Sequence, residues 1–198
     1  MNSMPTDRRQ RPKLDRATII DAAIARIERH GLEDLSARKL AQDLGCEAMS
    51  LYHHVANMEA LKDAIVDQLI ATIVPAEPAA SLENLRRYAD AYLELAVKYA
   101  RSFQLIATRR WKGMHATDAA KSAHESFKVL GLSADEALAR ARTLGAYLNG
   151  AGLALAAWAT DPDAPAADAR RVQADLGHGL DLLLRSLAEP GPSIRNRN

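Results

Sequence analysis

Residues 36–54 read SARKLAQDLGCEAMSLYHH, and this stretch decides the fold. Ser36 is expected to begin a short helix whose inward side carries three apolar residues at helical spacing, Leu40, Ala41 and Leu44. Gly45 is expected to end this helix, because glycine tolerates the positive φ that a sharp exit from a helix requires.

A second short helix is predicted to begin near Glu47 and to continue through Val55. Leu51 and Val55, four residues apart, can anchor this helix on a core, which leaves an outward side made of Ala48, Met49, Ser50, Tyr52 and His53. A helix, a glycine turn and a second helix form the helix-turn-helix pattern, whose second helix lies in the major groove of DNA. The same spacing also fits an αα-hairpin in any helical protein, so the spacing alone leaves both interpretations open.

The flanking sequence extends this motif to a compact group of four helices. Apolar side chains recur at helical spacing before Gly31, and Asn57 is expected to be the N-cap of a longer helix that reaches about Val74. Three stretches resemble the DNA-binding domain of the tetracycline-repressor (TetR) family in order and spacing: LDRATIIDAAIARIERHG (14–31), LSARKLAQDLG (35–45) and SLYHHVANMEALKDAI (50–65). The resemblance covers about residues 14–74. It implies a ligand-responsive transcriptional repressor that binds a palindromic operator as a dimer.

The resemblance also implies which side chains contact DNA. Ser36 can hold a phosphate while it caps its helix, and Tyr52 matches a family tyrosine that contacts the DNA backbone. The expected contacts are Ser36, Arg38, Lys39, Ala48, Met49, Ser50, Tyr52, His53 and His54. This sequence departs from the family pattern at positions expected to contact bases and at one expected to contact a phosphate. Ala48 and Met49 can make only apolar contacts to bases, and Met58 stands where the family often has a lysine.

Length and composition favour an all-α fold. The chain has 198 residues, of which 48% are hydrophobic and only 5% aromatic, and few stretches alternate with the period of a strand. The single cysteine, Cys46, excludes an intramolecular disulfide and fits a reducing cytoplasm. The N-terminus lacks the apolar core of a signal peptide. The net charge of +1 is not typical of a nucleic-acid binder, but basic residues concentrate in 1–13. This segment is expected to be a flexible basic arm, which either follows phosphates or only solubilises the chain.

A second domain is predicted over residues 81–189, after a proline-containing joint at 75–80 and before a flexible tail at 190–198. Its helices are expected from Ser81, over 117–130, over 133–159 with a Ser133–Glu136 capping box, and over 166–188. The small residues of 143–159 suit helix packing in water, since this stretch is short for a membrane span.

The last two helices resemble the pair through which the TetR family dimerises as a four-helix bundle. The expected interface residues are Gly150, Ala154, Trp158, Leu176, Leu180 and Leu184. The alternative is that both helices are intramolecular core, but dimerisation is favoured because a helix-turn-helix protein usually needs two half-sites. A small effector is expected in the middle of this domain. Its apolar walls would be Phe103, Trp111 and Tyr147, and its polar anchors His115, His124 and Asn149, if these residues do not simply build a core.

Two other functions compete with this hypothesis. One is a DNA-binding regulator or activator without a ligand, which a second domain filled by side chains would favour. The other is a helical enzyme, but the chain has no GxSxG, P-loop or GxGxxG motif. We therefore expect no enzymatic activity and no cofactor. A metal is not expected either, because His53 and His54 point about 100° apart on a helix and lack i, i+4 pairing.

Overall fold

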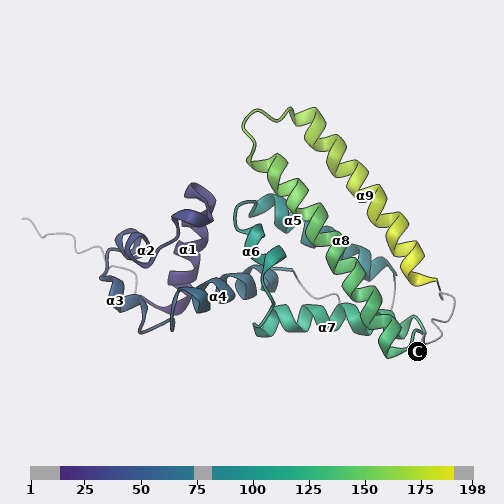
Figure 1. Cartoon of the computed structure of the whole chain (residues 1–198), viewed down its shortest axis with the longest axis horizontal. Coiled ribbons are helices and arrows are strands. Elements are labelled where there is room, and N and C mark those ends of the chain that lie inside the picture. The colour runs from purple at the N-terminus through teal and green to yellow at the C-terminus, as the bar shows by residue number, and fades with distance from the viewer. Residues whose placement is uncertain (1–13, 74–81, 190–198) are drawn as a thin grey trace, which may run out of the picture.

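The computed structural model describes residues 14–73 and 82–189, and in these ranges every element is a helix. Figure 1 shows a small group of helices, a larger group, and α4 reaching from one to the other. The small group contains α1 (Arg16–His30), the 3-10 turn η1 (Leu32–Asp34), α2 (Ala37–Leu44), α3 (Ala48–Leu51) and α4 (Met58–Ala71). The larger group contains α5 (Leu82–Lys98), α6 (Phe103–Thr108), α7 (Met114–Val129), α8 (Ala134–Thr160) and α9 (Ala166–Ala188). The predicted all-α class is confirmed. The predicted arm, joint and tail lie outside the described residues.

Short polar side chains begin the helices of the small group. The Ser36 hydroxyl accepts a hydrogen bond from the backbone N–H of Lys39 at 3.4 Å, and Asn57 Oδ1 accepts one from that of Ala60 at 2.8 Å. Both predicted N-caps are therefore confirmed. Gly45 ends α2 with φ of 63°, in the left-handed region that residues with a Cβ rarely adopt.

The second helix of the motif is shorter than its spacing predicts. α3 ends at Leu51, and Tyr52–His54 form a turn, so the predicted helix through Val55 is wrong in its length. Leu51 and Val55 are nevertheless both buried, with 1% and 6% of their surface exposed. The next helix has its N-cap at Asn57, two residues later. These two anchors and the early start of α4 leave no room for another helical turn.

A buried arginine holds α1, η1 and α2 together. Arg26 donates hydrogen bonds to the carboxylates of Asp34 and Asp43, both at 2.6 Å, and to the Asp34 carbonyl oxygen at 3.3 Å. The hydrogen bond to Asp43 raises the pKa of Arg26, so the arginine stays charged. Sequence patterning does not single out Arg26, because its partners lie 8 and 17 residues further along the chain.

Helix α4 belongs to both groups. It packs against α1 on one side and against α6 and α7 on another. Its buried residues accordingly spread over more than one stripe of the helix: Leu61, Ala64, Ile65, Val66, Leu69 and Ile70. Since one rigid element is shared, a change in the larger group can be passed to the small one.

Helix α8 forms the centre of the larger group, because it packs against α5, α6, α7 and α9. The predicted capping box at its start is confirmed: Ser133 and Glu136 each accept a hydrogen bond from the other's backbone N–H. The prediction omits α6 and begins α7 three residues too late, whereas α9 has the predicted bounds. No helix in the described ranges is long and apolar enough to cross a membrane.

Gly152 allows α8 to approach its neighbours closely. A Cβ at this position would overlap the ring of Phe103 from α6 and press on Ala96 from α5. Gly145, on the same helix, is the opposite case, because a Cβ there would meet no atom within 4 Å. Substitution of Gly145 is therefore a matched control for the same substitution at Gly152.

We expect Gly152→Ala to lower the free energy of unfolding by about 1–3 kcal/mol through overpacking. Gly145→Ala should leave it unchanged or raise it by up to about 1 kcal/mol, because alanine favours the helix. Urea unfolding followed by circular dichroism measures both, and equal stabilities of the two variants would contradict this packing.

Candidate nucleic-acid interface and ligand cavity

The segment formed by α3 and the turn after it presents large apolar side chains to solvent. Met49 is 69% exposed and Tyr52 is 39% exposed, while the neighbouring Leu51 is buried. The other predicted contacts on this segment are exposed or half-buried: Ala48, Ser50, His53 and His54. Exposed large apolar groups beside a rigid core are typical of a binding surface. Met49, Tyr52 and His53 are thus confirmed as outward-facing, whereas Ser50 is half-buried and Ala48 packs partly against the core.

The start of α2 adds polar groups next to this surface. Arg38 is exposed and forms no ion pair with any residue in 14–73 or 82–189. Lys39 instead forms an ion pair with Asp34, which Arg26 also binds. Of the two predicted basic contacts, Arg38 is therefore the one whose charge is not already neutralised. Among the described residues, no cluster of histidine, cysteine or acidic side chains could hold a metal ion.

A cavity of about 300 Å³ lies in the larger group, between α5, α7 and α8. Three aromatic rings line it, Tyr88 and Tyr92 from α5 and Trp111 from the segment between α6 and α7. Small residues on α7 and α8 leave the space open: Ala120, Ala123, Ala141 and Gly145. Leu138, Leu144 and Leu148 complete the apolar wall.

Hydrogen bonds fix the polar groups of this wall. The Tyr92 hydroxyl donates to Asn149 Oδ1 at 2.6 Å, and Trp111 Nε1 donates to the Ile106 carbonyl oxygen at 3.0 Å. Burial raises the pKa of Tyr88 to about 12 and also raises the pKa of Tyr92. Both phenols are therefore neutral near pH 7, and Arg142 is the one charged side chain in the described lining.

The six predicted ligand residues do not come together. Trp111 and Asn149 line the cavity, but Phe103 is fully buried in the core, where its ring meets the Tyr92 ring edge-on at 5.4 Å. Tyr147 points to α9 and donates a hydrogen bond to the Leu176 carbonyl oxygen at 2.5 Å. The other two predicted anchors contact protein groups outside the cavity lining: His115 contacts Asp67, and His124 contacts the Ala134 carbonyl oxygen. Tyr88 and Tyr92 were detectable as an i, i+4 aromatic pair, but that pattern is equally typical of a core.

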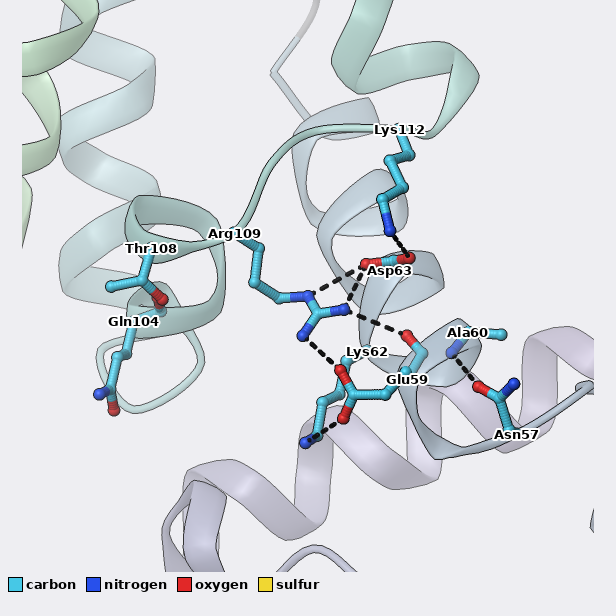
Figure 2. Close-up of polar contacts among 9 residues, drawn as sticks. All are labelled: Asn57, Glu59, Ala60, Lys62, Asp63, Gln104, Thr108, Arg109 and Lys112. Atoms are coloured by element: carbon cyan, nitrogen blue, oxygen red, sulfur yellow. Dashed lines mark hydrogen bonds and ion pairs between the residues drawn. The ribbon is translucent and has the colours of Figure 1, made fainter.

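The segment after α6, residues 109–116, connects the cavity to α4, and we call it the link segment. Figure 2 shows Arg109 reaching Glu59 and Asp63 on α4, with Lys112 on the other oxygen of Asp63. The Arg109 guanidinium lies 2.8 Å from Glu59 Oε2 and 2.6 Å from Asp63 Oδ1. Trp111, which lines the cavity, lies between these two basic residues in the chain.

The link segment also leads into α7, whose first turn is capped by a carboxylate of α4. Asp67 Oδ1 accepts a hydrogen bond from the backbone N–H of Ala116 at 3.0 Å, in the first turn of α7, and Asp67 Oδ2 lies 3.0 Å from His115 Nδ1. The N-cap position, Gly113, has no side chain for this purpose, and a Cβ there would overlap the Asp67 carboxylate. Glu59, Asp63 and Asp67 recur every four residues, so one side of α4 binds the whole link segment.

The ion pairs of this link persist across neutral pH. Hydrogen bonds from Lys62 and Arg109 hold the pKa of Glu59 at about 2, and the hydrogen bond to Asp63 raises the pKa of Arg109. Because the pKa of Glu59 is lowered from 4.5, its contribution is fully present above pH 4.5 and disappears as the pH falls toward 2. Protonation of Glu59 therefore does not switch the link near pH 7.

The six predicted interface residues divide between two environments. Leu180 and Leu184 are buried within the single chain, at 0% and 4% exposure, so their burial needs no partner. Gly150 is exposed, and Ala154, Trp158 and Leu176 are half-buried. The large apolar side chains that face solvent on these two helices are Leu138 and Leu153 on α8, at 38% and 39% exposure, and Leu182 on α9, at 53%.

Known proteins share both the N-terminal sequence and the fold. The family model described as bacterial regulatory proteins, tetR family, matches residues 19–65. The tetracycline repressor protein class D of Escherichia coli is 44% identical over 59 residues, which are 30% of this chain and 27% of that protein. The chain thus spans only 27% of the length of this relative.

Other matches extend beyond the N-terminal domain. The tetracycline repressor protein class A from transposon 1721 of Escherichia coli is 29% identical over 190 residues, which cover 91% of this chain and 84% of that protein. A TetR variant from Acinetobacter baumannii AYE, whose crystal structure holds minocycline, has a TM-score of 0.75 at 25% identity, covering 88% of this chain and 96% of that one. Residues 19–65 therefore match the tetR family of bacterial regulatory proteins, and the chain as a whole is similar in sequence and fold to tetracycline repressors.

Proposed function

We propose that the protein is a transcriptional repressor that binds a palindromic operator as a homodimer and is released by a small, largely apolar effector. The observation that carries the proposal is the link segment, because the same eight residues line the cavity through Trp111 and are bonded to α4 through Arg109, Lys112 and Ala116. The minocycline complex of a similar fold supports a ligand site in the larger group of helices. The protein is proposed to act in the cytoplasm, without enzymatic activity or cofactor.

The two groups of helices are proposed to divide these roles. Residues 14–74 are the DNA-binding domain, and residues 81–189 are the ligand-binding and dimerisation domain. Residues 1–13 are proposed as a basic arm and residues 190–198 as a tail. DNase footprinting of the purified protein on DNA upstream of its own and neighbouring genes tests the overall function, and absence of a protected palindrome would contradict it.

In the proposed complex, α3 and the turn after it enter the major groove. Met49 is then placed for apolar contact with a base, for instance a thymine methyl group, and the Tyr52 hydroxyl for contact with a phosphate. Two such segments in a dimer must reach successive major grooves, which lie about 34 Å apart on one face of the duplex. Affinity for the operator therefore depends on how far apart the two domains are held.

The effector is proposed to act on this separation through α4. An effector lowers operator affinity only if it binds more tightly to a conformation whose two DNA-binding domains are wrongly spaced. A ligand that enters the cavity contacts Trp111, and the link segment is held to three carboxylates on one side of α4. Movement of Trp111 can thus be passed to α4 without unfolding either domain.

A regulator without a ligand is the competing function. A second domain filled completely by side chains would support it, but the cavity here is within the size range of small-molecule sites. The aromatic lining favours the ligand-responsive alternative.

We expect Tyr52→Ala to weaken operator binding by roughly 1–3 kcal/mol, because it removes an exposed contact from the proposed recognition segment without disturbing buried Leu51. Tyr52→Phe removes only the hydroxyl and keeps the ring, so it shows which of the two groups makes the contact. A gel-shift titration at fixed salt measures both variants, and an affinity of Tyr52→Ala equal to the wild type would refute the contact.

We expect Leu182→Asp to produce folded monomers, because it places a charge on the exposed side of α9 that we propose to pack against a second copy. Leu180→Ala is the control on the same helix. It should lower stability by about 2–5 kcal/mol through a cavity within one chain, and leave the folded protein dimeric. Light scattering reports the mass, and a Leu182→Asp variant that is still dimeric would show that the interface does not include this side of α9.

We expect Arg109→Gln to uncouple the cavity from DNA, because it removes the guanidinium that binds Glu59 and Asp63. Lys62→Gln is the matched control, since Lys62 also binds Glu59 but lies on α4 itself and does not contact the link segment. Compounds that bind the wild type and release it from operator should still bind Arg109→Gln, as judged by Trp111 fluorescence in a Trp158→Phe background. They should release it less effectively in a gel shift. Full release of Arg109→Gln would exclude the ionic link as the route.

A further inference from the structure

We propose that the effector is an aryl carboxylate, with its ring against Tyr88, Tyr92 and Trp111 and its carboxylate at Arg142. This inference rests on the proposed ligand site and names the chemistry that the site selects. Three features of the cavity carry it: the arrangement of the aromatic rings, the charge of the lining, and the orientation of one amide.

The aromatic rings define a flat apolar site. The ring centroids of Tyr88 and Tyr92 are 6.3 Å apart and those of Tyr92 and Trp111 are 6.2 Å apart, with interplanar angles of 40° and 34°. Rings at these angles and distances do not stack face to face on each other. Tyr92 is almost wholly buried, so the surface left for a third ring comes mainly from the half-buried Tyr88 and Trp111. The lining on α7 and α8 includes three alanines and Gly145, at which an added Cβ would meet no atom within 4 Å.

The volume limits the size of this ligand. About 300 Å³ is at the lower end of small-molecule sites. One or two fused rings with a short polar substituent fit this space, whereas larger ring systems would require the walls to move apart.

Three aromatic rings alone could instead bind an organic cation through cation–π contacts. The charge of the lining excludes that alternative. Arg142 is the charged member of the described lining, no carboxylate accompanies it there, and both tyrosines are neutral phenols. Arg142 itself forms no hydrogen bond or ion pair with residues 14–73 or 82–189. Because Arg142 is exposed, a carboxylate that its guanidinium binds in bidentate fashion lies at the solvent-facing edge of the cavity.

Asn149 adds a second donor for the same ligand. Its Oδ1 accepts the hydrogen bond from the Tyr92 hydroxyl at 2.6 Å. Because Tyr92 contacts the oxygen of the amide, the NH₂ group of Asn149 can donate to a ligand. Asn149 lines the cavity one turn from Gly145 and two turns from Arg142 on α8. A donor and a cation on one helix bordering an aromatic site favour a ligand with acceptor oxygens over one with a neutral or cationic substituent.

Isothermal titration calorimetry of the full chain with three probes that share the naphthalene ring tests the proposal: 2-naphthoate, 2-naphthamide and (2-naphthylmethyl)ammonium. We expect the carboxylate to bind about tenfold more tightly than the amide, as a charge-assisted hydrogen bond predicts, and the ammonium to bind most weakly. Arg142→Gln should abolish the preference for the carboxylate, and Arg142→Lys should retain part of it.

Lys121→Gln is the matched control. It removes the same charge from α7, beside the cavity, but Lys121 is 70% exposed and does not line the cavity. This variant should keep the full preference for the carboxylate. Equal binding of carboxylate and amide to the wild type would overturn the proposal, as would tighter binding of the ammonium, a preference retained in Arg142→Gln, or no binding of any probe.

A gel shift with operator DNA separates this proposal from the proposed function. If 2-naphthoate binds with the expected preference but leaves operator affinity unchanged, the ligand chemistry stands and release by an effector is wrong. If a neutral compound that binds the cavity releases the protein from DNA while 2-naphthoate does not bind, release by an effector stands and the aryl carboxylate is wrong.

Discussion

The arrangement of the two groups of helices depends on one contact, in which a carboxylate of α4 caps the first turn of α7. The backbone N–H groups in the first turn of a helix need acceptors, and Gly113 offers no side chain to supply one. Asp67 supplies it from another helix, and the absence of a Cβ at Gly113 lets its carboxylate approach. The N-terminus of α7 is thereby fixed against the middle of α4, and with it the wall of the cavity.

The ion pairs around this contact determine orientation more than stability. Glu59 and Lys112 are largely exposed, and surface pairs of this kind contribute about 0–1 kcal/mol each. The stability of α4 comes instead from its apolar residues, which are buried against α1 on one side and α6 and α7 on another. Burial holds α4 in both domains, while the directional bonds of Arg109 select one relative position of α4 and Trp111. In the proposed mechanism, a ligand in the cavity displaces Trp111 from this position and leaves the hydrophobic core intact.

Local signals made the N-terminal domain predictable from the sequence. The caps at Ser36 and Asn57, the left-handed Gly45 and the anchors Leu51 and Val55 each depend on residues within a few positions. The length of α3 was predicted wrongly although its limits are local as well: Leu51 and Val55 are both anchored in the core, and α4 is already capped at Asn57. Arg26 was not predictable in this way, since its acidic partners come from η1 and α2.

The sequence by itself determined an all-helical chain, a helix-turn-helix with its outward side, and the capping box that begins α8. Only the tertiary structure decided which side of each later helix faces a cavity, a core or solvent. Phe103 and Trp111 have similar chemistry, yet one is enclosed by the core and the other borders the cavity. Leu180 and Leu182 are two residues apart, yet one is buried and the other exposed. Periodicity shows that a helix has an apolar side, but the neighbours that cover it come from distant parts of the chain, so burial is decided only when the helices pack.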